Sequence, residues 1–226
     1  MITSNARLAM QIGGRGFLEA HPPNDVTGAR FEGRFVIYSM MNHGSPIFGE
    51  DVSLFETDCA TQHGLGLGSA HFVAMRSGFG LESFHTGDDD FVGHLYARTS
   101  ARTRLRIYFD PAPDGSRSFE DRDSFTRGQL IATYRAEEFF QLDARAGVFD
   151  TRVSYTLIES SSFTFMDTKV DLAEVAPAMT DLSAGHAPED APRPIPIPHE
   201  EEPFTDRGPG VFAQRFPVGG AWLTVD

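Results

Sequence analysis

Six polar side chains within predicted strands are candidates for acid–base chemistry: Glu159, Tyr155, Glu56, His94, Tyr96 and Tyr134. Residues that alternate along a strand point to the same face of a sheet, and an apolar face is expected to point into the protein. This rule places Tyr155 and Glu159 on an inward face, and Glu56 on the aliphatic face of its own strand. A carboxyl group held in an apolar interior has a raised pKa and can act as an acid or a base. The alternative is that Glu56 and Glu159 lie at the mouth of the fold, in water.

The eight histidines raise the question of a metal site. The closest pair, His63 and His71, has neither the i, i+2 spacing of a strand face nor the i, i+4 spacing of a helix face. A site assembled from separate strands remains open. The glycine-rich run from His63 to Ser69 is not followed by a helical pattern, so it lacks the helix N-terminus that binds phosphate in nucleotide sites. We therefore expect no metal and no nucleotide cofactor.

Composition limits the partners and the compartment. The chain of 226 residues has a formal net charge of −13, which disfavours nucleic acids and anionic membrane surfaces as partners. Cys59 is the single cysteine, so an internal disulfide is excluded. Residues 1–18 contain no long apolar run after a basic stretch, and no segment has the length of a membrane-spanning helix. The sequence predicts a cytoplasmic protein.

Short alternating runs separated by turn residues extend through the middle of the chain and predict its fold. We expect strands over Phe31–Met41, Asp51–Cys59, Ala70–Ser77, Phe91–Thr99, Thr103–Phe109, Arg127–Arg135, Glu138–Leu142 and Thr151–Phe165. Strands at short spacing with no helices between them favour a sandwich or a barrel, and a barrel leaves no exposed edges. The prediction is an all-β fold, an antiparallel β-barrel of about eight strands over residues 30–171, after an N-terminal extension of residues 1–29. Side chains fill the interior of such a barrel, or it holds one small ligand.

The composition changes over residues 172–226, which are acidic and rich in proline. Nine of the 14 prolines lie between Pro177 and Pro217. Such a stretch taken alone predicts an extended linker or a disordered tail. Spaced aromatic residues, among them Phe212 and Trp222, favour an arm that docks on the barrel or on a second copy of the chain. A homo-oligomer formed through this arm is therefore one expectation.

Arg102, Arg104 and Arg106 alternate along one predicted strand. They share one face, and the apolar residues Leu105 and Ile107 share the other. Because the apolar face belongs inside, we expect the arginines to point outward. There they could pair with acidic residues of the next strand or bind an acidic partner.

The segment from about residue 103 to residue 165 resembles the allene oxide cyclase and dirigent barrel superfamily. Three pieces carry the resemblance: the alternating strand Arg104–Phe109 with the acidic turn after it, the strand Gly128–Tyr134, and the short strand and turn Phe140–Phe149. The turn departs from the family pattern, because Arg145 stands where the first glycine of the usual pair is expected. The resemblance implies an eight-stranded barrel with a hydrophobic cavity, in which a reactive intermediate is held in one conformation during ring closure. It does not assign active-site residues on this chain.

The function expected from these observations is a cyclase or isomerase without a cofactor, acting on a hydrophobic, polyketide-like natural-product intermediate inside the barrel. Catalysis by positioning and exclusion of water needs few charged groups, in keeping with the lack of a strong motif. Two alternatives remain open. One is a small-molecule binding protein of lipocalin type without turnover, and the other is an assembly or scaffold protein whose barrel is solid.

Overall fold

Antiparallel strands make up almost all of the regular structure that the described residues form. The computed structural model describes residues 6–20, 30–57, 66–86, 94–99, 102–143, 148–186, 195–196 and 212–225, and at several strand ends only the backbone is described. The longer strands are β1 (Ala6–Ala20), β2 (Arg30–Asn42), β4 (Phe72–Thr86), β5 (His94–Thr99), β6 (Arg104–Phe109), β7 (Gln129–Asp143), β8 (Val148–Ser160), β11 (Ala178–His186) and β13 (Phe212–Val225). The short elements are β3 (Ser45–Pro46), β9 (Phe163–Phe165), β10 (Thr168–Val170), β12 (Ile195–Pro196), the 3₁₀ turns η3 (Leu67–Ser69) and η5 (Asp123–Thr126), and α1 (Leu172–Val175).

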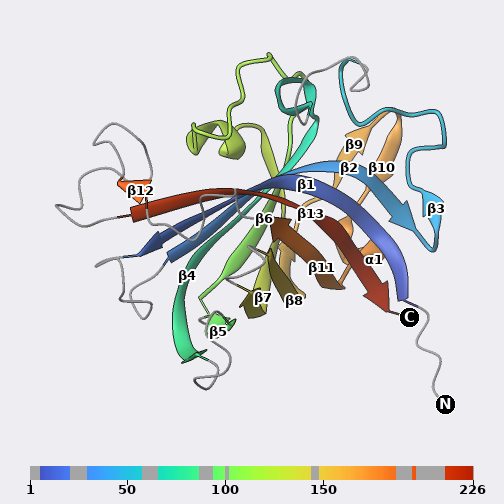
Figure 1. Cartoon of the computed structure of the whole chain (residues 1–226). Helices are drawn as coiled ribbons and strands as arrows, with labels where there is room; N and C mark the ends of the chain where they lie inside the picture. The colour runs from blue at the N-terminus through green and yellow to red at the C-terminus, as the bar shows by residue number, and fades with distance from the viewer. Residues whose placement is uncertain are drawn as a thin grey trace.

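The long strands close into an antiparallel barrel with eight strand positions. Round the ring the order is β1, β2, β4, β5 with β6, β7, β8, β11, β13 and back to β1. β5 and β6 share one position, because both pair with β4 on one side and β7 on the other. Figure 1 shows the long strands curving round a shared interior, with β1 and β13 lying side by side. The predicted all-β barrel is confirmed.

The barrel uses more of the chain than the predicted boundaries of residues 30–171. β1 lies in the predicted N-terminal extension, yet it pairs with both β2 and β13. β11 and β13 lie in the predicted arm of residues 172–226, yet they fill two positions of the ring. The aromatic C-terminal segment was expected to dock on the barrel as an arm. It is instead a strand of the barrel, β13. Most of the proline-rich stretch, residues 187–194 and 197–211, lies outside the described residues.

Several predicted strands have different bounds in the structure. Residues 51–57 form a loop whose one isolated β-bridge joins Phe55 to Ala70, so the strand predicted over Asp51–Cys59 is wrong in its described part. The two runs predicted over residues 127–142 are one strand, β7. The run predicted over residues 151–165 is divided into β8 and β9. The barrel has eight strand positions, close to the predicted number, although several of the segments that form them differ from the predicted ones.

Phenylalanine rings pack at the end of the barrel where β4 begins and β6 ends. Phe72 of β4 stacks on Phe109 of β6, with ring centroids 5.0 Å apart. Phe163 and Phe165 of the β9–β10 hairpin pack edge-on against Phe72, and Phe48 of the loop after β3 stacks on it at 5.8 Å. The rings are all buried. This cluster fills one end of the barrel, since aromatic pairs in such geometries add to the energy of apolar burial.

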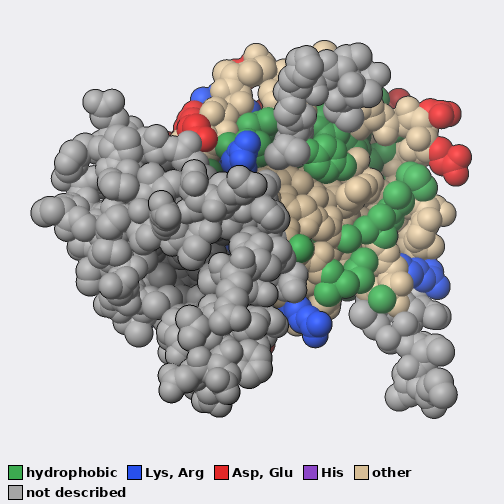
Figure 2. All heavy atoms as spheres, in the orientation of Figure 1, with side chains coloured by type: hydrophobic (Ala, Val, Ile, Leu, Met, Phe, Trp, Pro, Cys, Tyr) green, Lys and Arg blue, Asp and Glu red, His purple; other side chains and the backbone are tan. Residues whose placement is uncertain are grey.

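The outer wall is partly covered by the segment between β6 and β7. Arg117 fastens this segment by donating to the carbonyls of Leu67, Ala70 and Ser124 and to the Asp110 carboxylate. Elsewhere single hydrophobic side chains face outward, including Leu182, which is 49% exposed. Figure 2 shows such side chains over β1 and β13. Among the described residues, no helix has the length and apolar character needed to cross a membrane.

Candidate functional site inside the barrel

Asp181 is a carboxyl group with no exposed surface, turned into the barrel. β11 places it between Val153 of β8 and Trp222 of β13. The residues that alternate with it, Met179 and Ser183, are also buried. Alternation along the strand therefore directs Asp181 inward. A buried carboxylate is costly unless it is paired and hydrogen-bonded, so its partners decide what the site can do.

Arg76 reaches Asp181 from the opposite wall of the barrel. β4, which carries Arg76, is separated from β11 by three strand positions in either direction round the ring. Nη1 of Arg76 lies 3.2 Å from Oδ2 of Asp181, and the two side chains are 5% and 0% exposed. The ion pair thus crosses the barrel interior.

Tyr155 completes a triangle of polar contacts with these two residues. Its hydroxyl accepts a hydrogen bond from Arg76 at 3.1 Å and donates one to Oδ2 of Asp181 at 3.3 Å. Its ring packs edge-on against Trp222 at 5.6 Å, and Trp222 packs edge-on against Phe35 at 6.1 Å. The guanidinium carbon of Arg76 lies 5.5 Å from the centroid of the Phe35 ring. Aromatic walls round the polar groups lower the local dielectric and strengthen their electrostatic interactions.

Burial raises the pKa of the Asp181 carboxyl above its ordinary value of 3.8, while Arg76, Ser183, Tyr155 and Trp222 act in the opposite direction by stabilising the carboxylate. The two carboxyl oxygens differ. Oδ2 accepts from both Arg76 and Tyr155. Among the described residues, no hydrogen bond of ordinary geometry reaches Oδ1, or Nε1 of the cross-strand neighbour Trp222. In the described contacts Oδ1 is therefore the less engaged of the two carboxyl oxygens.

Two hydroxyl groups extend the cluster along the barrel. Ser183 follows Asp181 on the inward face of β11, and its Oγ lies 2.6 Å from Oγ1 of Thr151 on β8. Both residues are buried. We call Arg76, Asp181, Tyr155, Trp222, Ser183 and Thr151 the interior polar cluster. A carboxyl with a raised pKa beside a cation and a phenol is an arrangement that can transfer protons.

Tyr155 and Tyr134 are the predicted site residues that the structure buries in the core. Tyr155 is 1% exposed, and Val153 on the same face is fully buried, so the predicted inward face of this strand is confirmed there. Tyr134 packs edge-on against Tyr155 at 6.3 Å. Its hydroxyl donates to the carbonyl of Ala176 at 3.0 Å, and burial raises its pKa. That hydroxyl holds the segment after α1 against the barrel and points to a structural role for Tyr134.

Glu159 and Glu56 do not lie in the interior. Glu159 is exposed because the β7–β8 register shifts between Thr133 and Tyr134, which ends the alternation that would have turned it inward. Glu56 is 61% exposed in a loop, where it faces Nε2 of His71 at 3.3 Å. The alternative that both carboxylates are solvated therefore holds. His94 and Tyr96 lie in β5, and their side chains fall outside the described residues.

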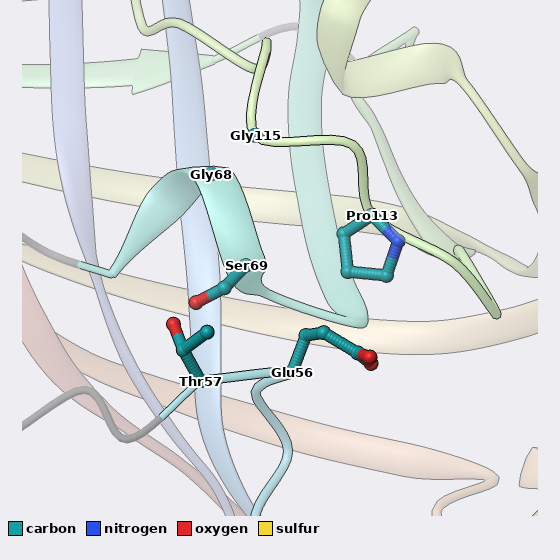
Figure 3. Close-up of a pocket in the computed structure, with 6 residues that line it drawn as sticks. All are labelled: Glu56, Thr57, Gly68, Ser69, Pro113 and Gly115. Carbon is teal, nitrogen blue, oxygen red and sulfur yellow. The ribbon is translucent and has the colours of Figure 1, made fainter.

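A hollow lies outside the barrel, at Glu56. It has a volume of about 290 Å³ and is lined by Glu56, Thr57, Gly68, Ser69, Pro113 and Gly115. Figure 3 shows the Thr57 and Ser69 side chains facing one another and the Glu56 side chain extending below Pro113. Glu56 is the one ionisable group of this lining and is mostly in water. The hollow lacks the converging charges of the interior polar cluster.

Asp181, Arg76 and Trp222 are site residues that sequence reasoning missed. Asp181 and Trp222 lie in the segment interpreted as an arm, and Arg76 lies near the end of the strand predicted over Ala70–Ser77. The available signal was the alternation of Met179, Asp181 and Ser183, which matches one face of a strand. It was hidden because two of these three inward residues are polar, so no apolar face could be seen.

The comparisons of this chain with protein-family models, with curated proteins and with solved structures found no match.

Proposed function

We propose that the protein is a cofactor-free isomerase or cyclase that transfers protons on a hydrophobic small molecule held inside the barrel. The observation that supports this proposal is the fully buried Asp181, in contact with Arg76 across the interior and with Tyr155 of the adjacent strand β8. Replacing a buried ion pair with apolar residues is often neutral or stabilising, so stability alone does not account for such a cluster. Ionisable groups with shifted pKa values gather at functional sites.

The proposed reaction begins at a carbon next to a carbonyl group. Asp181 takes a proton from that carbon through Oδ1, and the electron pair of the C–H bond forms an enolate. Arg76 and Tyr155 stabilise the developing negative charge on the enolate oxygen. In an isomerisation Asp181 returns the proton to a different carbon. In a cyclisation the enolate carbon attacks a second carbonyl of the same molecule, and the new alkoxide receives the proton.

The barrel supplies the positioning that such a reaction needs. One end is filled by the phenylalanine cluster, so the proposed substrate enters from the other end, where β4, β8 and β11 extend beyond the polar cluster. An aromatic, water-poor interior favours a planar, apolar substrate and protects an enolate from stray protonation. The resemblance of residues 103–165 to cyclase barrels supports the same reading by analogy only.

The test measures proton exchange, which does not require the natural substrate. The probe is 2-tetralone, an apolar ketone with acidic α-protons, incubated in D₂O and followed by proton NMR. We expect the protein to accelerate α-proton exchange and Asp181→Asn to lose about 100-fold or more of that rate. Glu159→Gln removes an exposed carboxylate and serves as the matched control, with an unchanged rate.

Ligand binding separates an enzyme from a carrier. Trp222 is the single tryptophan and belongs to the cluster, so quenching of its fluorescence reports on occupancy. An enzyme loses exchange rate in Asp181→Asn while 2-tetralone still binds. Binding without exchange in the unmodified protein would support a lipocalin-like carrier, and the absence of both in a folded protein would overturn the proposal.

A further inference from the structure

Three arginines form a row across the outer wall of the barrel. Arg15 of β1 is the direct partner of Arg34 of β2. Arg34 pairs with Met75 of β4, which in turn pairs with Arg106 of β6. Residues next to them, such as Phe35 and Leu105, are buried on the inward face, so the three arginines share the outward face. Directly opposed like charges repel in a sheet, so this row is unfavourable without a counter-charge.

A fourth arginine approaches the row from the covering segment between β6 and β7. Nε of Arg122 lies 2.8 Å from Oε2 of Glu32, and Nε of Arg34 lies 2.7 Å from Oε1 of the same carboxylate. Burial raises the pKa of the Tyr108 hydroxyl, and the charges of Arg106 and Arg122 act in the opposite direction. Arg15 lies 5.7 Å from the ring centroid of Phe119 in the same segment. We call Arg15, Arg34, Arg106 and Arg122 the outer arginine cluster.

Arg34 is the fully buried member of this cluster. Its guanidinium lies 4.3 Å over the Phe17 ring, and it donates to the Phe119 carbonyl. Within the described part of the chain its Nη2 has no hydrogen-bond partner. A buried guanidinium nitrogen without an acceptor is costly, and the usual acceptor for it is a carboxylate or phosphate oxygen.

Three neighbouring carboxylates face arginines that do not belong to this cluster. Asp110 is paired with Arg117, and Asp114 and Asp121 face Arg127. Glu32 pairs with Arg34 and Arg122. In the described contacts the four arginines of the cluster therefore have one paired carboxylate, in a chain whose net charge is −13.

We infer that the outer arginine cluster binds a multiply charged oxyanion of the phosphate class. Arginine presents planar pairs of N–H donors that match phosphate oxygens, and several guanidinium groups round one site provide both charge and geometry. Because this site lies on the outer wall, it is separate from the proposed reaction in the interior.

Calorimetric titration of the full chain with pyrophosphate tests the inference. We expect binding that weakens as NaCl is raised, and about a tenfold loss of affinity in Arg122→Gln or Arg106→Gln, as removal of one charged hydrogen bond predicts. Arg127→Gln is the matched control, because Arg127 lies in the same covering segment, is 47% exposed against 44% for Arg122, and faces other carboxylates. That variant should bind pyrophosphate like the unmodified protein.

Two results would overturn the inference. One is the absence of pyrophosphate binding at low salt by a protein that unfolds cooperatively. The other is an equal loss of affinity in Arg122→Gln and Arg127→Gln, which indicates diffuse attraction only. Adding pyrophosphate during the 2-tetralone assay keeps the two proposals distinct, since the exchange rate is expected not to change. A phosphoserine peptide titrated in parallel shows whether the oxyanion is accepted on a peptide or as a free ion.

Discussion

Burying Asp181 removes a carboxylate from water, and Arg76 and Tyr155 offset that cost only while the cluster is complete. The penalty for burying one ion is several kcal/mol even after relaxation. The contact with Arg76 across the barrel interior, at 3.2 Å, and the contact with Tyr155 of the adjacent strand β8, at 3.3 Å, return much of it. The three side chains therefore act as a unit, and single substitutions in them are expected to be non-additive.

Asp181→Ala is predicted to destabilise the protein by about 3–5 kcal/mol, because it leaves the Arg76 charge buried without its carboxylate. The double variant Arg76→Leu with Asp181→Leu is predicted to cost clearly less than the sum of the two single changes. Urea unfolding followed by circular dichroism gives the free energies. Strict additivity would contradict the assignment of a coupled pair.

The direction of the pKa shift of Asp181 determines whether stability rises or falls with pH. The native carboxyl has a raised pKa, so between the ordinary value of 3.8 and that raised value the folded state binds more protons than the unfolded state. Stability is therefore predicted to fall as pH rises through this window and then to level off. Asp181→Asn should lack this component of the slope, as urea midpoints measured at a series of pH values would show.

Asp171 gives the opposite sign and is the natural comparison. It caps α1 by accepting from the Ala173 N–H at 2.9 Å, and hydrogen bonds from Ser160 and the Ala173 N–H lower its pKa. Its contribution is present above pH 3.8 and is lost as pH falls through its native pKa. Asp171→Asn should therefore lose stability at neutral pH relative to acid, which distinguishes the two carboxyls in one experiment.

At the scale of strands, glycines allow β1 to pack closely against its neighbours. A Cβ at Gly14 would lie 2.0 Å from the Arg34 carbonyl oxygen and 2.8 Å from Cα of Phe35. Both atoms belong to the backbone of β2 and cannot rotate away. The absence of a side chain at Gly14 is thus what lets β1 pack against β2 at this point.

Gly14→Ala is predicted to destabilise the barrel by about 1–3 kcal/mol, the range seen for overpacking. Gly219→Ala is the matched control, because Gly219 lies in the neighbouring strand β13 and a Cβ there meets nothing within 4 Å. That change is expected to stay within about 0.5 kcal/mol, as for ordinary surface positions. Thermal unfolding of the two variants side by side provides the comparison, and equal losses would contradict the close approach of β1 and β2.

Sequence reasoning predicted the fold class and part of the site, and the misses have physical causes. Alternation identified β2, β6 and the buried Tyr155 because those strands have one apolar face. It missed β1, where glycines replace side chains, and β11, where the inward face carries Asp181 and Ser183. It misplaced Glu159 because a register shift turns the following side chains to the opposite face of the sheet. Such a shift cannot be recognised from the types of the residues. The contact between Arg76 and Asp181 depends on barrel closure, which no local pattern encodes.

For the molecule as a whole, barrel closure predicts unfolding as one unit. Trp222 lies in β13, is fully buried, and packs against Tyr155 of β8 and Phe35 of β2. Its fluorescence therefore reports on the C-terminal strand, while far-ultraviolet circular dichroism reports on all strands. We predict that the two unfolding curves in urea coincide. A fluorescence change at a lower urea concentration would show that β13 leaves a barrel that otherwise persists.

The seam between β1 and β13 also has a consequence during synthesis. Ala6 lies opposite Val225, so β1 finds one of its two partners only when β13 has left the ribosome. At roughly 5–20 residues per second, β1 waits about 10 seconds or more with that edge unpaired. An open edge recruits other extended chains, so nascent copies on one polysome are at risk of pairing with each other. Slower initiation of translation, which spaces the ribosomes, should raise the yield of folded protein.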